Sequence, residues 1–175
     1  MRRYDLTADI YDERYREEQE AKYKAALENL SLNRSSIVLD VGCGSGLFFS
    51  HVADEVEAAV GVDVSRELLR LANQRTKRYQ NVFLVLADAD YLPFKRELFD
   101  LVFAFTIIQN VSNPVETLKE LTLAAKVDAS FVATGLKAAV SLERFGEILH
   151  RAKLQVVSLQ DDEALQCYVA ACKVG

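Results

Sequence analysis

Three glycines stand at the point where a buried strand is expected to turn into a helix, and this placement is typical of a cofactor-binding turn. Gly42, Gly44 and Gly46 directly follow the apolar run 37–41. Glycine adopts positive φ readily, and it lets the backbone approach a ligand without an intervening Cβ. These residues therefore predict a cofactor site at the carboxyl end of the first strand.

The spacing of the glycines separates two classes of cofactor. A dinucleotide fingerprint requires Gly-x-Gly-x-x-Gly, but here the third glycine comes one residue early and Leu47 takes its place. This spacing disfavours a nicotinamide enzyme. With Asp40 ahead of the glycines, the segment 38–46 resembles the first motif of the class I S-adenosylmethionine-dependent methyltransferases, in particular the small type 11 methyltransferase domains.

Three later positions extend the resemblance. The second expected strand, 59–62, ends in Asp63, where the family carries an acid that grips the ribose hydroxyls. The third strand runs into Asp88 and Ala89, the acid-plus-small pair that faces adenine in the family, and the fourth opens with an aromatic-acid pair at 99–100. The four motifs follow the family order across residues 38–110.

The resemblance implies S-adenosyl-L-methionine as cofactor and S-adenosyl-L-homocysteine as product. It assigns the ribose to Asp63, the adenine amino group to Asp88, an adenine ring nitrogen to the Ala89 amide, the adenine face to Val64 and the methionine amine to Asp40 through water. A lone acid at a strand end is more often a turn or helix cap, so these acids favour a cofactor only as a set. The expected cofactor-binding residues are Tyr11, Asp40, Gly42, Cys43, Gly44, Gly46, Asp63, Val64, Asp88, Ala89 and Phe105.

The acceptor side is less defined. The loop 106–110 lies where families that methylate planar amino groups carry Asn-Pro-Pro-Tyr or Asp-Pro-Pro-Tyr, and this sequence departs from that pattern. Thr106, Gln109 and Asn110 are the acceptor-side candidates. Methyl transfer from a sulfonium mainly requires alignment and exclusion of water, so no catalytic residue is assigned. The acceptor is either a small molecule or an RNA or translation-related macromolecule, and the alternative is a non-catalytic protein that binds the cofactor as a regulator or as a subunit of a methyltransferase complex.

The N-terminal segment has two readings. In relatives, the stretch before the first strand folds over the cofactor, so residues 1–34 are expected to form a lid and a helix ahead of a domain at 35–175. Tyr4, Tyr11 and Tyr15 are then placed to close the pocket. The alternative is that Tyr15 and Tyr23 simply pack this helix, with its Glu18 to Lys22 pair, on the sheet.

The expected architecture is α/β: a doubly wound, Rossmann-like, seven-stranded and mostly parallel sheet, helices on both faces, and a C-terminal antiparallel strand pair at 155–159 and 166–173. Helices are predicted at 45–54, after a Ser65 cap, and from Pro114, where Asn113 and Glu116 form a capping box. A fifth strand is expected over 130–136.

Strand three is expected at one edge of the sheet, and the run 82–86 is unusually apolar for an open edge. Either a homodimer or a small zinc-binding activator protein, which some relatives pair with by strand addition, would cover it. The net charge of −5 gives no general attraction to nucleic acid, although local basic stretches could touch phosphate.

Composition sets further bounds. The chain of 175 residues fits one domain, and no apolar run approaches the length of a membrane span. The three cysteines are odd in number and lack metal-ligand spacing, which predicts reduced thiols and no metal site. We therefore expect a cytoplasmic protein without membrane contact.

Overall fold

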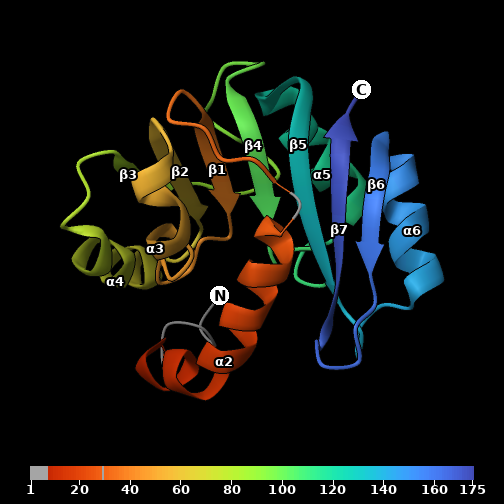
Figure 1. Ribbon diagram of the computed structural model, residues 1–175, viewed down its shortest axis with the longest axis horizontal. Helices are drawn as coiled ribbons and strands as arrows, with labels where there is room; N and C mark the ends of the chain where they lie inside the picture. The colour runs from red at the N-terminus through yellow and green to blue at the C-terminus, as the bar shows by residue number, and fades with distance from the viewer. Residues whose placement is uncertain (1–7, 29) are drawn as a thin grey trace.

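The computed structural model describes the backbone of residues 8–28 and 30–175, and the side chains of residues 17–28 and 30–175. Helices and strands alternate along most of the chain (Figure 1). The elements are α2 (Ala8–Leu27), β1 (Ile37–Val41), α3 (Phe49–Val52), a 3₁₀ turn η1 (Ala53–Glu55), β2 (Ala58–Asp63), α4 (Arg66–Thr76), β3 (Val82–Leu86), β4 (Phe99–Ala104), α5 (Pro114–Ala124), β5 (Ala125–Leu136), α6 (Leu142–Arg151), β6 (Leu154–Gln160) and β7 (Cys167–Val174).

The strands form one seven-stranded sheet in the order β3-β2-β1-β4-β5-β7-β6. Strands β1 to β5 are parallel, whereas β7 is antiparallel to both β5 and β6, so the predicted fold class is confirmed. The chain reverses its direction of travel across the sheet between β1 and β4. In such sheets, ligands bind beyond the carboxyl ends of the strands at this reversal.

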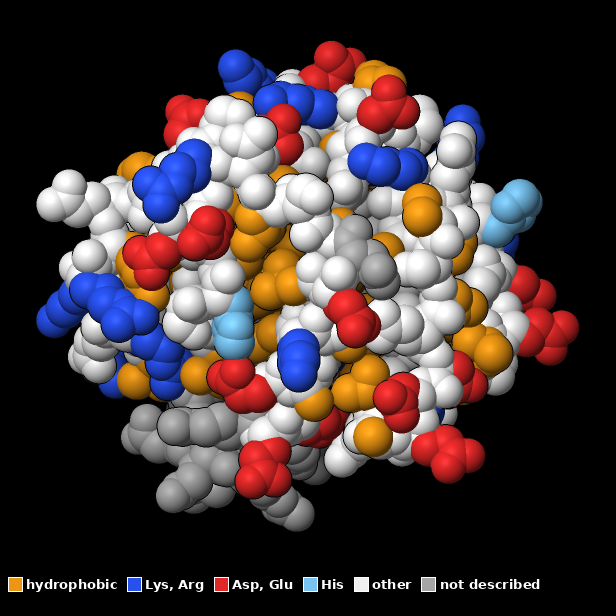
Figure 2. All heavy atoms as spheres, in the orientation of Figure 1, with side chains coloured by type: hydrophobic (Ala, Val, Ile, Leu, Met, Phe, Trp, Pro, Cys, Tyr) orange, Lys and Arg blue, Asp and Glu red, His pale blue; other side chains and the backbone are white. Residues whose placement is uncertain are grey.

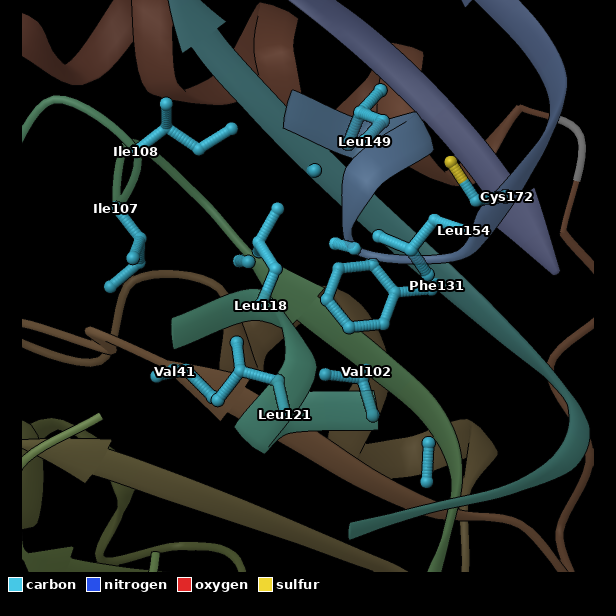
Figure 3. Packing of buried hydrophobic residues seen from close by; sticks show 14 of the residues in the cluster. Val41, Val102, Ile107, Ile108, Leu118, Leu121, Phe131, Leu149, Leu154 and Cys172 are labelled. Atoms are coloured by element: carbon cyan, nitrogen blue, oxygen red, sulfur yellow. The ribbon is translucent and has the colours of Figure 1, made fainter. Parts of the chain in front are cut away.

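Each face of the sheet carries its own apolar layer. Helices α5 and α6 pack on one face, where Leu118, Leu121 and Leu149 lie against Val102 and Phe131 of the sheet (Figure 3). On the other face, the described part of α2 and the segment around α3 contribute a second buried cluster that includes tyrosine and phenylalanine rings. Because both faces are covered, the central strands are apolar on consecutive residues.

The helix expected over 45–54 is shorter than predicted. Residues 42–48 form turns, and only α3 followed by η1 is helical before β2. The cause is Gly46, whose φ of +77° belongs to the left-handed region and interrupts any right-handed helix through this position. The glycine turn therefore extends several residues further than the sequence pattern indicated.

The capping box expected at the start of α5 is not formed. Pro114 occupies the first turn as predicted, but the Asn113 side chain makes no cap hydrogen bond. Instead, Thr117 donates to the Asn113 carbonyl from both its backbone N–H and its hydroxyl, and Glu116 pairs with Lys119 at 2.9 Å. The Ser65 cap of α4 is confirmed, since its hydroxyl accepts a hydrogen bond from the Leu68 amide.

Strand β5 begins at Ala125, five residues before the expected 130, directly after α5. The early residues pair with β4 through Phe99, and a register shift separates this pairing from the regular ladder that starts at Leu101 and Ser130. The acid of the fourth motif, Asp100, lies at this amino-terminal end. It accepts hydrogen bonds from the Ile37 amide and the Lys126 ammonium, so it ties strands together far from the carboxyl ends.

Candidate cofactor and acceptor site

A cavity of about 430 Å³ lies at the carboxyl ends of β1, β2 and β4. This size falls within the range of ordinary small-molecule sites. It brings together most of the expected cofactor-binding residues, which come from four separate segments of the chain. Those that line it are Asp40, Gly42, Cys43, Gly44, Asp63, Val64, Asp88, Ala89 and Phe105.

The glycine turn is fixed against the neighbouring strand. The amides of Gly42 and Cys43 both donate to the Val62 carbonyl, at 2.7 and 3.0 Å. Gly42 has a φ of +73°, and a Cβ on it would lie 2.7 Å from Ile107 Cδ1. Only glycine satisfies both conditions, so the backbone here forms the cavity wall directly.

Asp63 holds the end of β2 and the glycine turn together. Its Oδ2 accepts a hydrogen bond from the Gly44 amide at 2.9 Å, and its Oδ1 accepts one from the Ser65 amide at 2.8 Å. These bonds fix the carboxylate in one orientation at the cavity wall. Because a carboxylate accepts several hydrogen bonds at once, holding the turn is compatible with binding a diol.

Asp40 is the buried acid of the site. It is 2% exposed, and among the described residues its Oδ1 has no hydrogen-bond partner. Burial is the main cause that raises the pKa of this carboxyl to about 8; the nearby Asp63 carboxylate adds to the rise, and the Lys22 amine opposes it. A buried carboxyl without a partner at the cavity wall is the group that a ligand's cationic or hydrogen-bond-donating group would satisfy.

The raised pKa of Asp40 predicts how stability depends on pH. In the unfolded chain an aspartate titrates near 3.9, so between about pH 4 and about pH 8 the folded ligand-free protein holds one proton more. Stability therefore falls as pH rises through this window, by a few kcal/mol in total, and levels off above it. Asp40→Asn keeps the shape without the ionisation, so we expect it to lose this decline.

Urea unfolding of the wild-type protein and of Asp40→Asn, measured from pH 5 to 9, checks this difference. Asp54→Asn is a suitable control, because this aspartate lies exposed in η1. Parallel pH profiles for wild type and Asp40→Asn would show that Asp40 is ionised in the folded protein throughout.

One side of the cavity is open to solvent. Asp88 is exposed, and its Oδ1 accepts a hydrogen bond from the Asp90 amide at 3.0 Å. Val64 is 46% exposed, whereas Ala89 is buried beneath the loop. An acid, an apolar side chain and a backbone turn thus line this side of the cavity.

The acceptor-side candidates are divided by the structure. Thr106 and Asn110 line the cavity, but Gln109 does not. The Gln109 side chain instead donates to the Thr106 carbonyl at 3.0 Å. Thr106 has a φ of 59°, an unusual conformation for a β-branched residue that is found mainly at functional sites.

One expected cofactor residue does not line the cavity, and another has no described side chain. Gly46 is absent from the cavity lining, and its missing Cβ faces Ala72 of α4. The side chain of Tyr11 lies outside the described residues, as do Tyr15 and residues 1–7 with Tyr4, so the predicted closure by these rings stays a prediction.

The sequence placed the N-terminal segment over the pocket, but it did not assign Gln19 or Tyr23 to the cavity wall. Gln19 and Tyr23 line the cavity, and Figure 1 shows α2 running past the carboxyl ends of β1 and β4. The helical spacing that marked Tyr23 as a packing residue predicted its burial. No signal in the sequence places that ring beside a cofactor site, because the crossing of α2 over the strand ends is a tertiary feature.

The cysteines are buried and form no disulfide. Burial raises the pKa of the Cys43 thiol well above its usual value, which disfavours the thiolate and therefore a nucleophilic role. Within the described residues, no group of histidine, cysteine and acidic side chains has the arrangement of a metal site. None of the described helices is both long and apolar enough to span a membrane.

Comparison with known proteins identifies the family. A family model described as a methyltransferase domain matches residues 39–133, which is more than half of the chain. The chain belongs to this methyltransferase family. The matched region contains the glycine turn, Asp63, Asp88 and the whole of β4, so it includes most of the segments that line the cavity described above.

Two curated relatives show the range of the family. The methyltransferase is 31% identical over 122 residues to a malonyl-[acyl-carrier protein] O-methyltransferase from Marinomonas sp., a match that covers 69% of this chain and 45% of that protein. It is 38% identical over 90 residues to a demethylmenaquinone methyltransferase from Tropheryma whipplei, covering 51% and 37%. The chain thus spans less than half the length of either relative.

Solved structures match over nearly the whole chain. A SAM-dependent methyltransferase from Aquifex aeolicus has a TM-score of 0.85 at 19% identity, covering 98% of both chains. A chain of the complex between the Haloferax volcanii Trm112 methyltransferase activator and its partner has a TM-score of 0.86 at 18% identity, covering 98% and 97%. At these identities the match shows that the fold is shared from α2 to β7.

The polar groups and the volume of the cavity fit S-adenosylmethionine, the cofactor of this class. The buried Asp40 oxygen lacks a partner among the described residues, Gly42 leaves the cavity wall free of side chain, and Asp63 is held rigidly beside it. The cavity volume is that of a single ligand of moderate size.

Proposed function

We propose that this methyltransferase transfers the methyl group of S-adenosylmethionine to an acceptor that enters the cavity beside Thr106 and Asn110. One observation carries this function: Asp63, fixed by the Gly44 and Ser65 amides, shares one cavity with an Asp40 oxygen that has no hydrogen-bond partner among the described residues. Together they offer separate polar contacts for a ribose and for an amino-acid group.

The roles of the residues follow from their chemistry. Asp63 would accept hydrogen bonds from the ribose diol, Asp88 and the Ala89 amide would bind the adenine edge, and Val64 would cover its face. Asp40 would bind the methionine ammonium. The bound cofactor supplies an activated methyl group on a sulfonium, so the chain's own task is to align the acceptor and exclude water.

The acceptor class is drawn from the relatives and the surface. The two curated relatives are named for a quinone and for a malonyl thioester on a carrier protein. On the face shown in Figure 2, acidic and basic side chains are interspersed around α2, while Lys and Arg gather over α4. This mixed surface beside the acceptor side favours a small molecule or a carrier-bound group over RNA.

A binding and turnover experiment tests the function. S-adenosylhomocysteine is titrated into the purified protein by calorimetry, and release of S-adenosylhomocysteine from S-adenosylmethionine is then measured with demethylmenaquinol, malonyl-acyl carrier protein and bulk transfer RNA. Binding with turnover on a probe supports the function. Binding without turnover on any probe favours the non-catalytic alternative, and absence of binding by the folded protein contradicts the cofactor site.

Residues 1–34 are proposed to cover this site as a lid and helix of the single domain. Support comes from α2, which places Gln19 and Tyr23 in the cavity wall. The segment thereby contacts the site rather than only the sheet.

A small activator protein is proposed to cover the free edge of β3. The sheet order leaves β3 at the edge, and its Phe83 and Leu86 are 54% and 48% exposed. Val64 and Tyr91, in the loops after β2 and β3, are 46% and 80% exposed. Strand addition would pair the outer backbone groups and bury these side chains. The fold match to a chain from a Trm112 complex favours an activator over a homodimer.

Replacing Phe83 with aspartate is expected to abolish this association. Sedimentation velocity is measured for the protein alone and with the Haloferax volcanii Trm112 activator as probe, and hydrogen exchange of the β3 amides is followed in parallel. Val157→Asp, at a 69% exposed position on the opposite edge strand β6, is the matched control. Self-association that Phe83→Asp abolishes would assign the edge to a homodimer. If the β3 amides exchange equally fast with and without the activator, the proposed docking of the activator on β3 is contradicted.

A further inference from the structure

A buried lysine that does not itself line the cavity is hydrogen-bonded to a residue on its acceptor side. Lys22, on α2, is only 2% exposed, and its Nζ donates a hydrogen bond to Thr106 Oγ1 at 3.0 Å. The two residues are 84 positions apart in the chain. Thr106 itself lines the cavity, so its hydroxyl oxygen connects the cavity wall to an amine that solvent hardly reaches.

The backbone holds Thr106 rigidly in its unusual conformation. Its N–H donates to the Thr134 hydroxyl at 2.8 Å, and its carbonyl accepts from the side chains of Gln109 at 3.0 Å and Asn110 at 2.7 Å. With a φ of 59°, this threonine would relax without such restraints. The hydroxyl is therefore presented in one fixed position between the cavity and Lys22.

The surroundings of Lys22 make its neutral amine easier to form than that of an exposed lysine. Among the described residues, Thr106 is the only hydrogen-bond partner of Nζ, and an ammonium with one partner in a buried place is costly. Burial lowers the pKa of Lys22, and the acidic groups that face it, Glu18 on its own helix, Asp40 of β1 and Cys167 of β7, oppose this effect. The amine is thus poised to accept a proton.

The same surroundings stabilise the ammonium once it has formed. Nζ lies 5.8 Å from the ring centroids of both Tyr23 and Phe105, within the distance of a cation–π contact. The Glu18 carboxylate, on the same helix, also lowers the cost of the new charge by coulombic attraction. A solvent-excluded amine with these neighbours can hold a proton through a single turnover.

We propose that Thr106 Oγ1 and Lys22 Nζ form a two-step proton path that removes a proton from the methyl acceptor. The acceptor proton passes to Oγ1 while the hydroxyl proton passes to Nζ, which leaves threonine unchanged and lysine as ammonium. The electron pair of the broken acceptor–hydrogen bond forms the bond to the incoming methyl group, and the pair of the broken carbon–sulfur bond stays on sulfur.

This role rests on the proposed methyl transfer and narrows its substrate class. A proton path is useful only for an acceptor that must lose a proton, such as a hydroxyl, an amine or an acidic C–H. A carboxylate is already deprotonated at neutral pH and gains nothing from it. Of the probes above, demethylmenaquinol belongs to the first class and malonyl-acyl carrier protein to the second.

The protonation of Lys22 can be measured without the acceptor. In protein carrying ¹³C-labelled lysine and saturated with S-adenosylhomocysteine, the Cε resonance is followed against pH and assigned by its loss in Lys22→Met. We expect the midpoint to lie below the pH of the turnover assay, because only the neutral amine can accept a proton. Thr106→Val removes the oxygen that an ammonium would contact and should lower the midpoint further, whereas Thr106→Ser should preserve it.

Turnover gives the second readout. On demethylmenaquinol, Lys22→Met and Thr106→Val should each lower the rate about 100-fold or more at unchanged S-adenosylhomocysteine affinity, and Lys24→Met should not. A Lys22 midpoint above the pH of the turnover assay, or equal rates of wild type and Lys22→Met on demethylmenaquinol, would overturn the proton path. Absence of S-adenosylhomocysteine binding by the wild type would contradict the proposed function instead, and the lysine titration would then be followed in the ligand-free protein.

Discussion

Replacing Asp63 with alanine is expected to weaken S-adenosylhomocysteine binding by about 100-fold. A hydrogen bond to a charged acceptor contributes roughly 1.5 to 3 kcal/mol, and the ribose diol would make two of them with this carboxylate. Some of that loss is recovered by water, so we expect a net cost of about 3 kcal/mol, which corresponds to about two orders of magnitude in Kd.

A second effect adds to the loss of direct contacts. Asp63 also accepts hydrogen bonds from the Gly44 and Ser65 amides, so its removal frees the glycine turn that forms the cavity wall. Asp63→Asn separates the two effects, because an amide fills the same volume and keeps one acceptor oxygen. It should bind more tightly than the alanine variant and more weakly than the wild type.

Calorimetric titration of the three proteins, with thermal unfolding to confirm that each is folded, measures the effect. Asp54→Ala, on the exposed η1 turn, controls for the loss of one negative charge. Equal affinities for wild type and Asp63→Ala would remove Asp63 from the cofactor site and leave it as a structural link between β2 and the glycine turn.

The strand ends were predictable because the central strands are buried on both faces. Such strands appear in the sequence as continuous apolar runs, and the first polar residue after each run marks its carboxyl end. Asp40 near the end of β1, Asp63 at the end of β2 and Asp88 after β3 therefore fell at the same edge of the sheet as expected, and the cavity brings all three together.

The errors lie where tertiary contacts override local patterns. Residues from Ser45 onward have a helical composition, but Gly46 adopts a left-handed conformation because α4 packs against its Cα, and the helix starts only at Phe49. At α5, the Thr117 hydroxyl contacts Asp90 Oδ1, in the distant loop after β3, as well as the Asn113 carbonyl, and no capping box is formed. Neither outcome could be derived from the residues of the segment alone.

Lys22 shows the same limit at the candidate site. Its spacing from Glu18 predicts an ion pair that supports the helix, but the structure buries this lysine against Thr106. The sequence contains no sign of this, because the position of α2 across the sheet depends on contacts with distant strands. The cofactor half of the site follows from contiguous motifs, whereas the acceptor half is assembled from segments far apart in the chain.

Gly46→Ala is expected to destabilise the protein by about 3 kcal/mol or more, a much larger effect than Gly44→Ala. Both glycines have positive φ, +77° and +55°, so alanine at either position costs roughly 1 to 2 kcal/mol in backbone strain. The two sites differ in the space available for a Cβ. A Cβ on Gly46 would lie 2.9 Å from Ala72 Cβ and 3.2 Å from its Cα, whereas nothing lies within 4 Å of one on Gly44.

The additional cost at Gly46 comes from overpacking, which typically adds about 1 to 3 kcal/mol. Because the nearest atoms belong to a helix rather than to a flexible side chain, α4 itself must shift to make room. Urea unfolding of both variants measures the difference. Similar stabilities for Gly46→Ala and Gly44→Ala would show that backbone strain alone sets the cost and that α4 is free to move.

A double-mutant cycle with Ala72→Gly isolates the contact. Removing the Ala72 methyl costs about 1 kcal/mol in helix propensity, but it should recover part of the loss caused by Gly46→Ala, so the two substitutions should be less than additive.

The contact between Gly46 and Ala72 also bears on function. The α4 cap residue Ser65 donates its amide to Asp63, so a displaced α4 would move the carboxylate as well. Gly46, although outside the cavity lining, would then set the geometry of the ribose contact, and Gly46→Ala should weaken S-adenosylhomocysteine binding more than its distance from the cavity suggests.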